Sequence, residues 1–477
     1  MNRRRFLTTT TLSAASAVFA RSTRAQKNGA PRPNIVFFLI DDQRNTTLGC
    51  TGDPIVQTPN IDRLAREGVM FSDAFVTTSI CAASRASIFT GLTECTHGYT
   101  FGKPPVPEKF TRDAYPALLR RAGYRTGFVG KYGVKLEGFE DAGLFDYFQS
   151  RDRPYLRKQD DGTVRHIDEI NTEQAIEFVR SCSSDTPFCL SVSFSSTHAE
   201  DRDKENHYPC IDAVKGMYED VTFPEPRLND PEIFESQPDF LKNSLNRVRY
   251  FWRWDTPEKY QKNMRAYYRL ITGVDVMIGR ILDELDKNGL ADNTIVIYLS
   301  DNGYYMGNRG FAGKWSHYEQ SLRVPLIVFD PRKPDRGNAG STECDAMALN
   351  MDIPPTILEL AGVKPPEHYQ GRSLKPFVDG ASPDHGERTL RWREDFFVEH
   401  RMDHEKIPKW EGVHERRYVY ARYYGQEPPY EFLHDLKRDP DQLENFVDNP
   451  DYAATLSRLR KRCEQLHAEY VEVRNSA

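Results

Sequence analysis

Short, almost wholly apolar segments alternate with amphipathic ones along most of the chain, and this alternation limits the possible folds more than any other feature. An apolar run of about four to eight residues without a polar face is typical of a strand that is buried on both sides. Such a strand belongs in a sheet with helices on both faces. The segments of this kind are residues 34–40, 188–194, 294–299 and 324–329, and residues 124–129 indicate a further strand.

Segments with helical character separate these strands. Residues 60–68 and 115–123 each end on a glycine, residues 269–290 carry apolar side chains on one face, and residues 353–361 have proline in the first turn. Strands that alternate with helices predict an α/β fold, in which a large and mostly parallel sheet is sandwiched by helices.

The C-terminal part of the sequence has a different texture. Residues 417–423 and 430–436 are short alternating stretches, and residues 453–473 have helical character. We therefore expect a large domain over residues 32–380 and a smaller α+β subdomain over residues 385–477, which carries an antiparallel sheet.

The N-terminus resembles a bacterial export signal of the twin-arginine variety. Arg3, Arg4 and Arg5 precede Phe6 and Leu7, and a small-residue, mildly apolar stretch follows. We expect residues 1–25 to be a signal peptide and the protein to be exported, either to the periplasm or into the medium.

The composition excludes some partners. A formal net charge of −6 gives no sign of a nucleic-acid partner, which favours a basic surface. Beyond the signal peptide, no apolar run reaches the length of an integral membrane span.

Polar side chains follow two of the predicted strands. Asp41 and Asp42 come directly after the first strand, and Asp301 and Asn302 come after a later one. Ligands of open α/β sheets bind beyond the carboxyl ends of the strands. Carboxylate and amide oxygens suit calcium or magnesium. Alternatively, each pair is an ordinary set of turn and helix-cap residues.

A cysteine at position 81 opens another predicted helix, and Arg85 follows it four residues later. A helix N-terminus and an arginine both stabilise an anion, which would make Cys81 reactive. The alternative is a buried structural cysteine.

The segment from Cys81 to Gly91 reads Cys-Ala-Ala-Ser-Arg-Ala-Ser-Ile-Phe-Thr-Gly. It resembles the signature of the type I sulfatases, a family within the alkaline-phosphatase superfamily. The resemblance implies an alkaline-phosphatase-like fold. It also implies that a formylglycine-generating enzyme oxidises Cys81 to formylglycine, whose hydrated aldehyde is the nucleophile. Most members have proline where this chain has Ala83.

The resemblance extends over residues 34–371 and to residues 431–445. It implies one calcium ion, whose ligands would be Asp41, Asp42, Cys81, Asp301 and Asn302. Sulfate would be bound by the lysines of Gly130-Lys131-Tyr132 and Gly313-Lys314-Trp315, Arg85 would hold the geminal diol, and His198 would protonate the leaving oxygen. The implied catalytic residues are Cys81, Arg85, Lys131, His198 and Lys314.

One departure from the family pattern affects the chemistry. Many relatives have a histidine two residues after the lysine of the first segment, and this chain has Gly133. Either another histidine substitutes, with His97 and His317 as candidates, or His198 works alone. A catalytically degenerate protein that binds carbohydrate or calcium is a further alternative.

The family implies hydrolysis of a sulfate ester, and we expect the substrate to be a carbohydrate from a sulfated polysaccharide. A phosphomonoester or phosphonate-ester hydrolase is the alternative within the superfamily. Residues 199–262 look like a long insertion that shapes a pocket. Its His207 and residues 249–254, together with His317, are candidate pocket residues, unless these aromatics pack only on one another.

Overall fold

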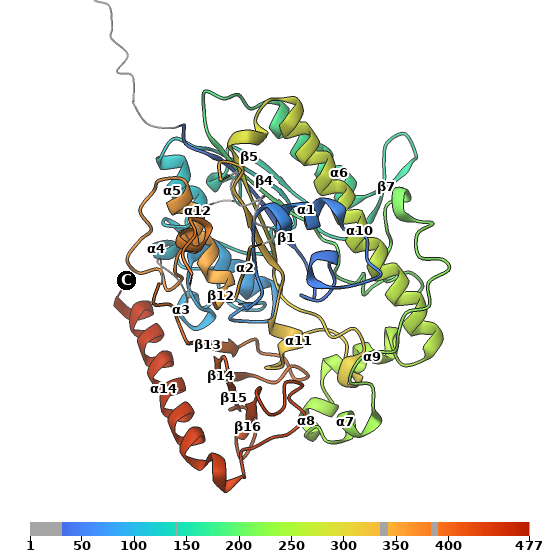
Figure 1. Cartoon of the computed structure of the whole chain (residues 1–477), viewed down its shortest axis with the longest axis vertical. Helices are drawn as coiled ribbons and strands as arrows, with labels where there is room; N and C mark the ends of the chain where they lie inside the picture. The colour runs from blue at the N-terminus through green and yellow to red at the C-terminus, as the bar shows by residue number, and fades with distance from the viewer. Residues whose placement is uncertain (1–30, 140, 334–341, 383–389, 477) are drawn as a thin grey trace, which may run out of the picture. The chain divides into compact units, whose positions relative to one another are not determined.

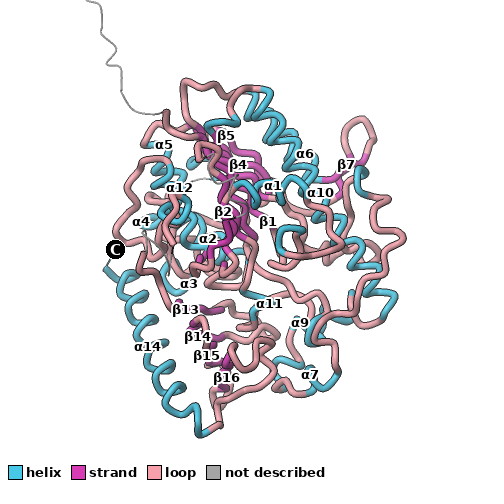
Figure 2. Tube along the Cα trace, viewed as in Figure 1, coloured by secondary structure: helices cyan, strands magenta, loops and turns pink. Residues whose placement is uncertain are grey.

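An eight-stranded sheet forms the centre of the fold in the computed structural model (Figure 2). The structure describes residues 31–139, 141–333, 342–382 and 390–476, so the predicted signal peptide lies outside the described residues. The order across the sheet is β11-β2-β10-β9-β1-β8-β4-β5. The strands are β1 Asn34–Ile40, β2 Val69–Phe71, β4 Arg125–Gly130, β5 Tyr147–Ser150, β8 Phe188–Ser193, β9 Thr294–Ser300, β10 Leu326–Phe329 and β11 Thr342–Cys344.

The prediction of a mostly parallel sheet is confirmed. Strands β9, β1, β8, β4 and β5 run parallel to one another. Strand β10 is the exception, because it pairs antiparallel with both β9 and β2.

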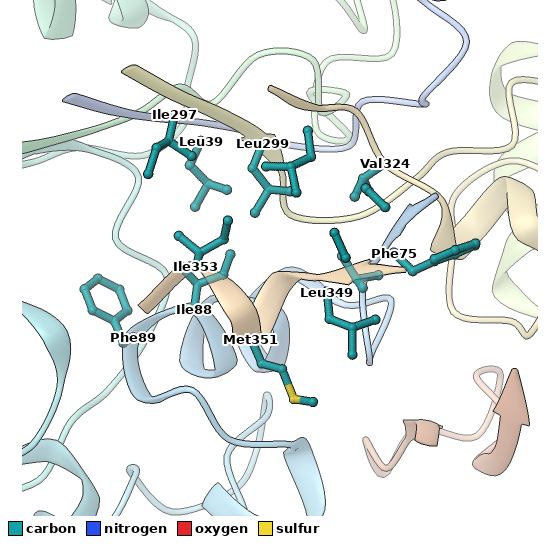
Figure 3. Packing of buried hydrophobic residues seen from close by; sticks show 14 of the residues in the cluster. Leu39, Phe75, Ile88, Phe89, Ile297, Leu299, Val324, Leu349, Met351 and Ile353 are labelled. Carbon is teal, nitrogen blue, oxygen red and sulfur yellow. The ribbon is translucent and has the colours of Figure 1, made fainter. Parts of the chain in front are cut away.

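Alternate residues of β1 face two different cores, as expected for a strand buried on both sides. Ile35, Phe37 and Leu39 lie in one core, with residues of α2 Cys81–Thr90, α5 Tyr115–Arg121 and α12 Ile353–Leu360. Figure 3 shows part of this layer, where Ile88 and Ile353 lie beneath Leu39 and Leu299. The other core holds Val36, Phe38 and Ile40, with residues of α1 Pro59–Glu67, α6 Ile167–Arg180 and α10 Pro257–Lys287.

A second, four-stranded antiparallel sheet follows near the C-terminus, as the sequence predicts (Figure 1). One face carries Phe397, Val413 and Leu433 and packs on the last helix, α14. The other face contributes Trp410 and Phe432 to the core that also lies against the large sheet. Its strands and the helix are β13 Asp395–His400, β14 Trp410–Glu415, β15 Tyr418–Tyr423, β16 Tyr430–Asp435 and α14 Ala453–Ser476.

Residues Arg32–Ala477 cluster as one compact unit. None of the helices in the described ranges combines the length and the apolar character that crossing a bilayer requires. The shorter elements are β3 Ala74–Phe75, β6 Leu156–Lys158, β7 Val164–His166, β12 Ala348–Leu349, α3 Glu94–His97, α4 Glu108–Thr111, α7 Pro231–Glu235, α8 Asp239–Lys242, α9 Leu245–Arg253, α11 Glu319–Leu322 and α13 Lys375–Val378.

Candidate active site

Four neighbouring strands of the large sheet end at one place. In the order β9, β1, β8 and β4, they are followed by Asp301, Asp41, His198 and Lys131. Ile40 of β1 lies opposite Ser300 of β9, so the acidic pairs after these strands are neighbours. The parallel direction of the strands therefore brings together side chains that lie far apart in the sequence.

The acidic side chains form a cluster of oxygen atoms. One carboxylate oxygen from each of Asp41, Asp42 and Asp301 lies within 4.8 Å of the others. Asp41 Oδ1, Asp42 Oδ2 and Asn302 Oδ1 are buried and have no hydrogen-bond partner among the described residues. Oxygens on opposite sides of a calcium ion are about 4.6–5.2 Å apart, so the residues present fit this ion.

Three buried cations surround the cluster. Lys131 Nζ donates to Asp41 Oδ2, and Lys314 Nζ donates to Asp42 Oδ1. Arg85 Nε donates to Asp301 Oδ2 at 2.8 Å, and its Nη1 donates to the carbonyl oxygen of Lys131 at 2.6 Å. Three cationic side chains thus balance three carboxylates, and an added divalent cation makes the site attractive to an anion.

The carboxyl groups do not titrate alike. Burial raises the pKa of Asp41, but the charges of Lys131, Arg85 and Lys314 together lower it well below its usual range. Burial raises the pKa of Asp42 despite Lys314. Burial and the charge of Asp41 raise the pKa of Asp301 to about 6. A divalent cation would favour the charged form of each carboxyl.

Cys81 is the first residue of α2, and every residue of this helix is buried. The Cys81 thiol is unpaired, and the residue is 6% exposed. Burial lowers the pKa of Lys131 and Lys314, but neighbouring carboxylates and Cys81 raise both by more, so the two lysines are charged. Cys81 therefore lies at a helix N-terminus within the electrostatic reach of both lysines.

The segment that carries His198 is held by a residue that the sequence analysis missed. Asp168 near the start of α6 accepts hydrogen bonds from Ser195 N at 3.1 Å and Ser196 N at 2.9 Å. An aspartate in the first turn of a helix is so common as a cap that its sequence position gave no signal. Asp168 thus connects α6 to the segment after β8.

The ring of His198 has three polar neighbours. Its Nδ1 is 2.7 Å from the carbonyl oxygen of Ala199, which can only accept, so this nitrogen carries the proton in the neutral ring. Its Nε2 is 3.6 Å from Asp42 Oδ2. Arg153 Nη1 lies 3.2 Å from Nδ1. Burial and then Arg153 lower the pKa of His198 well below its usual value, so the ring is neutral. Arg153 is a second residue that the sequence analysis missed.

Gly133 occupies a position that is tight for a side chain. Its φ is +71°, and a Cβ atom there would lie 3.0 Å from Arg85 Cδ, so Arg85 would have to shift by a few tenths of an ångström. A histidine at position 133 therefore requires a strained backbone and a displaced Arg85.

Neither candidate substitute for the missing histidine has a ring nitrogen available to the site. His97 Nε2 contacts Ser87 Oγ at 3.2 Å, and its Nδ1 accepts from Tyr99 N. His317 contacts Tyr423 and His434 through its two ring nitrogens. Both rings are thus engaged elsewhere, and both are fully or almost fully buried.

The candidate pocket residues lie in different environments, and only some of them are beside the site. Trp254 is buried in an aromatic cluster with Tyr208, Tyr260 and Tyr304, which is packing among aromatics. Arg249 lies 4.8 Å from the ring of Trp315, next to Lys314, which places α9 beside the site. His207 is buried, and its Nδ1 lies 3.2 Å from the carbonyl oxygen of Glu200.

This fold and site are those of a sulfuric ester hydrolase. Residues 33–363 match the family model for sulfatases, and residues 307–469 match that for the C-terminal part of N-sulphoglucosamine sulphohydrolase. The chain belongs to the sulfatase family.

Curated relatives match over nearly the whole chain. The N-acetylglucosamine-6-O-sulfatase of Bacteroides thetaiotaomicron is 28% identical, over 96% of this chain and 90% of the relative. An ulvan-active sulfatase of Formosa agariphila is 26% identical, over 94% of this chain and 83% of the relative.

Solved structures share the fold. One, in complex with its substrate D-glucosamine-2-N,6-O-disulfate, is 25% identical with a TM-score of 0.78, over 92% of this chain and 98% of the other. The phosphonate monoester hydrolase of Agrobacterium radiobacter is 22% identical with a TM-score of 0.75, over 92% and 96% of the two chains. The second likeness concerns the fold alone.

Proposed function

We propose that this sulfatase hydrolyses a sulfate ester on a carbohydrate from a sulfated polysaccharide, with calcium bound and with a formylglycine nucleophile made from Cys81. The observation that carries the proposal is the place of Cys81, at the start of α2 and within electrostatic reach of Lys131 and Lys314. The relatives that act on N-acetylglucosamine 6-sulfate and on ulvan support a carbohydrate substrate.

The proposed chemistry also requires a calcium ion and the modification of residue 81. Calcium would be held by Asp41, Asp42, Asp301, Asn302 and residue 81, and it would polarise a sulfate oxygen. Formylglycine at position 81 would supply a hydrated aldehyde, whose second hydroxyl would let sulfate leave without attack of water on sulfur.

The residues of the chain supply charge and position. A sulfate ester is an unreactive anion, so the barrier falls mainly through fixed positive charges that are aimed at its oxygens. Lys131 and Lys314 carry that charge, and Arg85 orients residue 81 while its Nε is anchored on Asp301. His198 Nε2 is the atom placed to take a proton and deliver it to the leaving oxygen.

The nucleophile is tested by peptide mass spectrometry across Cys81 in protein produced together with a formylglycine-generating enzyme. We expect the mass of formylglycine, and turnover of an aryl sulfate that the Cys81→Ala variant lacks. An unmodified thiol in an active wild-type protein, or full activity of Cys81→Ala, would refute the proposed nucleophile.

Calcium is tested by chelation. We expect EGTA to lower both the melting temperature and the turnover, and added Ca²⁺ to restore both. Asp42→Asn should weaken the recovery, whereas Asp283→Asn on the exposed side of α10 should not. Equal melting temperatures with and without chelator would contradict a calcium site.

The phosphate-ester and degenerate alternatives are separated by substrate. Matured wild-type protein should turn over an aryl sulfate faster than the matching aryl phosphate and phosphonate. Faster phosphate or phosphonate turnover would select that alternative. Binding of a sulfated glycan without any turnover by matured protein would select the degenerate one.

We also propose export through the segment 1–25, and a division into a catalytic domain, residues 32–380, and a subdomain, residues 385–477. N-terminal sequencing of the protein recovered from the periplasm or medium tests the first proposal. A mature N-terminus near residue 26 is expected, and an intact Met1 on exported protein would contradict it.

A further inference from the structure

A hollow of about 830 Å³ lies beside the candidate active site. Two segments line it, residues 152–156 before and within β6, and residues 200–204 directly after His198. Its volume falls within the range of about 300–1,000 Å³ that small-molecule sites occupy.

Arg153 connects this hollow to the catalytic machinery. It lines the hollow, and its Nη1 lies 3.2 Å from His198 Nδ1 and donates to the carbonyl oxygen of Ala199 at 3.2 Å. Because His198 faces the leaving oxygen in the proposed reaction, the hollow lies on the side of the leaving group. When a sulfate ester of a polysaccharide is cleaved, the leaving group is the sugar.

Glu200 provides a buried acceptor in this hollow. The residue is 6% exposed, and its Oε2 has no hydrogen-bond partner among the described residues. Its backbone is fixed, because Glu200 N donates to the carbonyl oxygen of His207 at 2.7 Å. A buried carboxylate oxygen without a donor is costly, and a sugar hydroxyl is the kind of donor that satisfies it.

The lining also includes a cation. Lys204 is exposed, and its Nζ lies 3.6 Å from the centre of the ring of Trp252, a residue outside the lining. The other carboxylates of the lining already have partners: Asp201 pairs with the arginines at 249 and 253 of α9, Asp152 pairs with Arg153, and Asp203 accepts from two backbone N–H groups. A cation held beside the hollow is suited to a sugar ring that carries an acidic group.

We propose that this hollow binds the part of an oligosaccharide next to the sulfated sugar, with Glu200 accepting from a hydroxyl and Lys204 facing an anionic substituent. This inference rests on the proposed function. It specifies the proposed substrate further, as an anionic oligosaccharide of at least two sugars rather than a single sulfated sugar.

The test compares Glu200→Gln with the wild type on three substrates: an aryl sulfate, a sulfated monosaccharide and the corresponding sulfated disaccharide with a uronic acid. We expect kcat/KM for the disaccharide, relative to the aryl sulfate, to fall about tenfold, mainly through KM. The ratio for the monosaccharide should change much less. Glu469→Gln, at an exposed glutamate that lines a cavity sharing no residue with this one, is the control for the same chemical change elsewhere and should leave all ratios unchanged.

Binding provides a readout that does not depend on turnover. In the Cys81→Ala background, calorimetry should show weaker disaccharide binding after Glu200→Gln and after Lys204→Met, the second being an exposed change that spares folding. Equal losses on all three substrates, or unchanged disaccharide affinity in both variants, would overturn the subsite. A wild type without sulfatase activity whose disaccharide binding still depends on Glu200 would overturn the proposed function and leave the subsite standing.

Discussion

At the scale of single residues, the candidate site is crowded around Arg85. Its guanidinium binds Asp301 and the backbone of Lys131, and its side chain also passes Gly133 so closely that an added Cβ atom would push it aside. Gly133, which stands where the family has a histidine, therefore leaves the space that the Arg85 side chain occupies. A site built in this way tolerates change at position 133 poorly, for reasons separate from the lost histidine.

Gly133→Ala tests this packing. We expect a loss of about 1–2 kcal/mol of stability from a left-handed alanine, and a fall in kcat of about tenfold or more because Arg85 is displaced. Gly362→Ala is the control, since its φ is +74° and nothing lies within 4 Å of the added atom. It should lose the same stability and keep full activity. Equal activities of the two variants in an aryl sulfate assay would show that Arg85 is not displaced.

At the scale of elements, the strands were easier to predict than the helices. The four apolar runs and residues 124–129 all form strands, because an apolar run without a polar face is typical of a buried strand. The direction of β10 was not predictable, since direction depends on connections rather than on composition. Helix α10 begins at Pro257, twelve residues before the predicted start, because its first turns carry many charged and polar residues that hide the apolar period. Helix α6 was missed for the same reason.

Site residues were easier to predict where they directly follow a strand. Asp41 and Asp301 were predicted from the ends of β1 and β9, which sequence patterns identify. Lys131, which follows β4, was predicted from the family resemblance. Arg153 and Asp168 were not predicted, because each reaches the site through a contact between distant segments. Such a contact leaves no periodic trace in the sequence.

Asp168 offers a test of how α6 supports the segment after β8. Asp168→Asn replaces one acceptor oxygen by a donor, so at least one buried N–H from Ser195 or Ser196 loses its partner. We expect a loss of about 1–3 kcal/mol in urea unfolding, together with a lower kcat as His198 shifts. Asp283→Asn, on an exposed part of α10, should change neither. A destabilised variant with unchanged kcat would limit Asp168 to a structural role.

At the scale of the whole described chain, a pair of buried acids lies where the second sheet packs against the segments on either side of α2. Glu94 of α3 and Glu399 of β13 lie together, and Glu399 N donates to the carbonyl oxygen of Thr77, four residues before Cys81. Burial and the charge of Glu399 raise the pKa of Glu94 to about 8. Thr78 and Arg401 oppose this rise without cancelling it.

This pair predicts a pH dependence of stability. The folded protein keeps a proton on Glu94 that the unfolded chain releases above its ordinary pKa of 4.5. Stability should therefore fall as the pH rises from about 5 to 8, by at most about 1.4 kcal/mol per pH unit from this group. Glu94→Gln should flatten the slope in urea unfolding, whereas Glu232→Gln, exposed on α7, should not. An unchanged slope in Glu94→Gln would contradict the raised pKa.

The burial of α2 has a consequence for the order of events during biosynthesis. The carbonyl oxygen of Tyr470 in α14 accepts from Thr96, and the carbonyl oxygen of Arg474 accepts from Lys109, so a helix synthesised long after α2 docks beside the helix that follows α2. In the folded protein the whole of α2 is buried, and Cys81 is 6% exposed. On the proposed chemistry, a maturation enzyme must reach Cys81 before α2 is packed into the fold, and a molecule that folds first stays inactive.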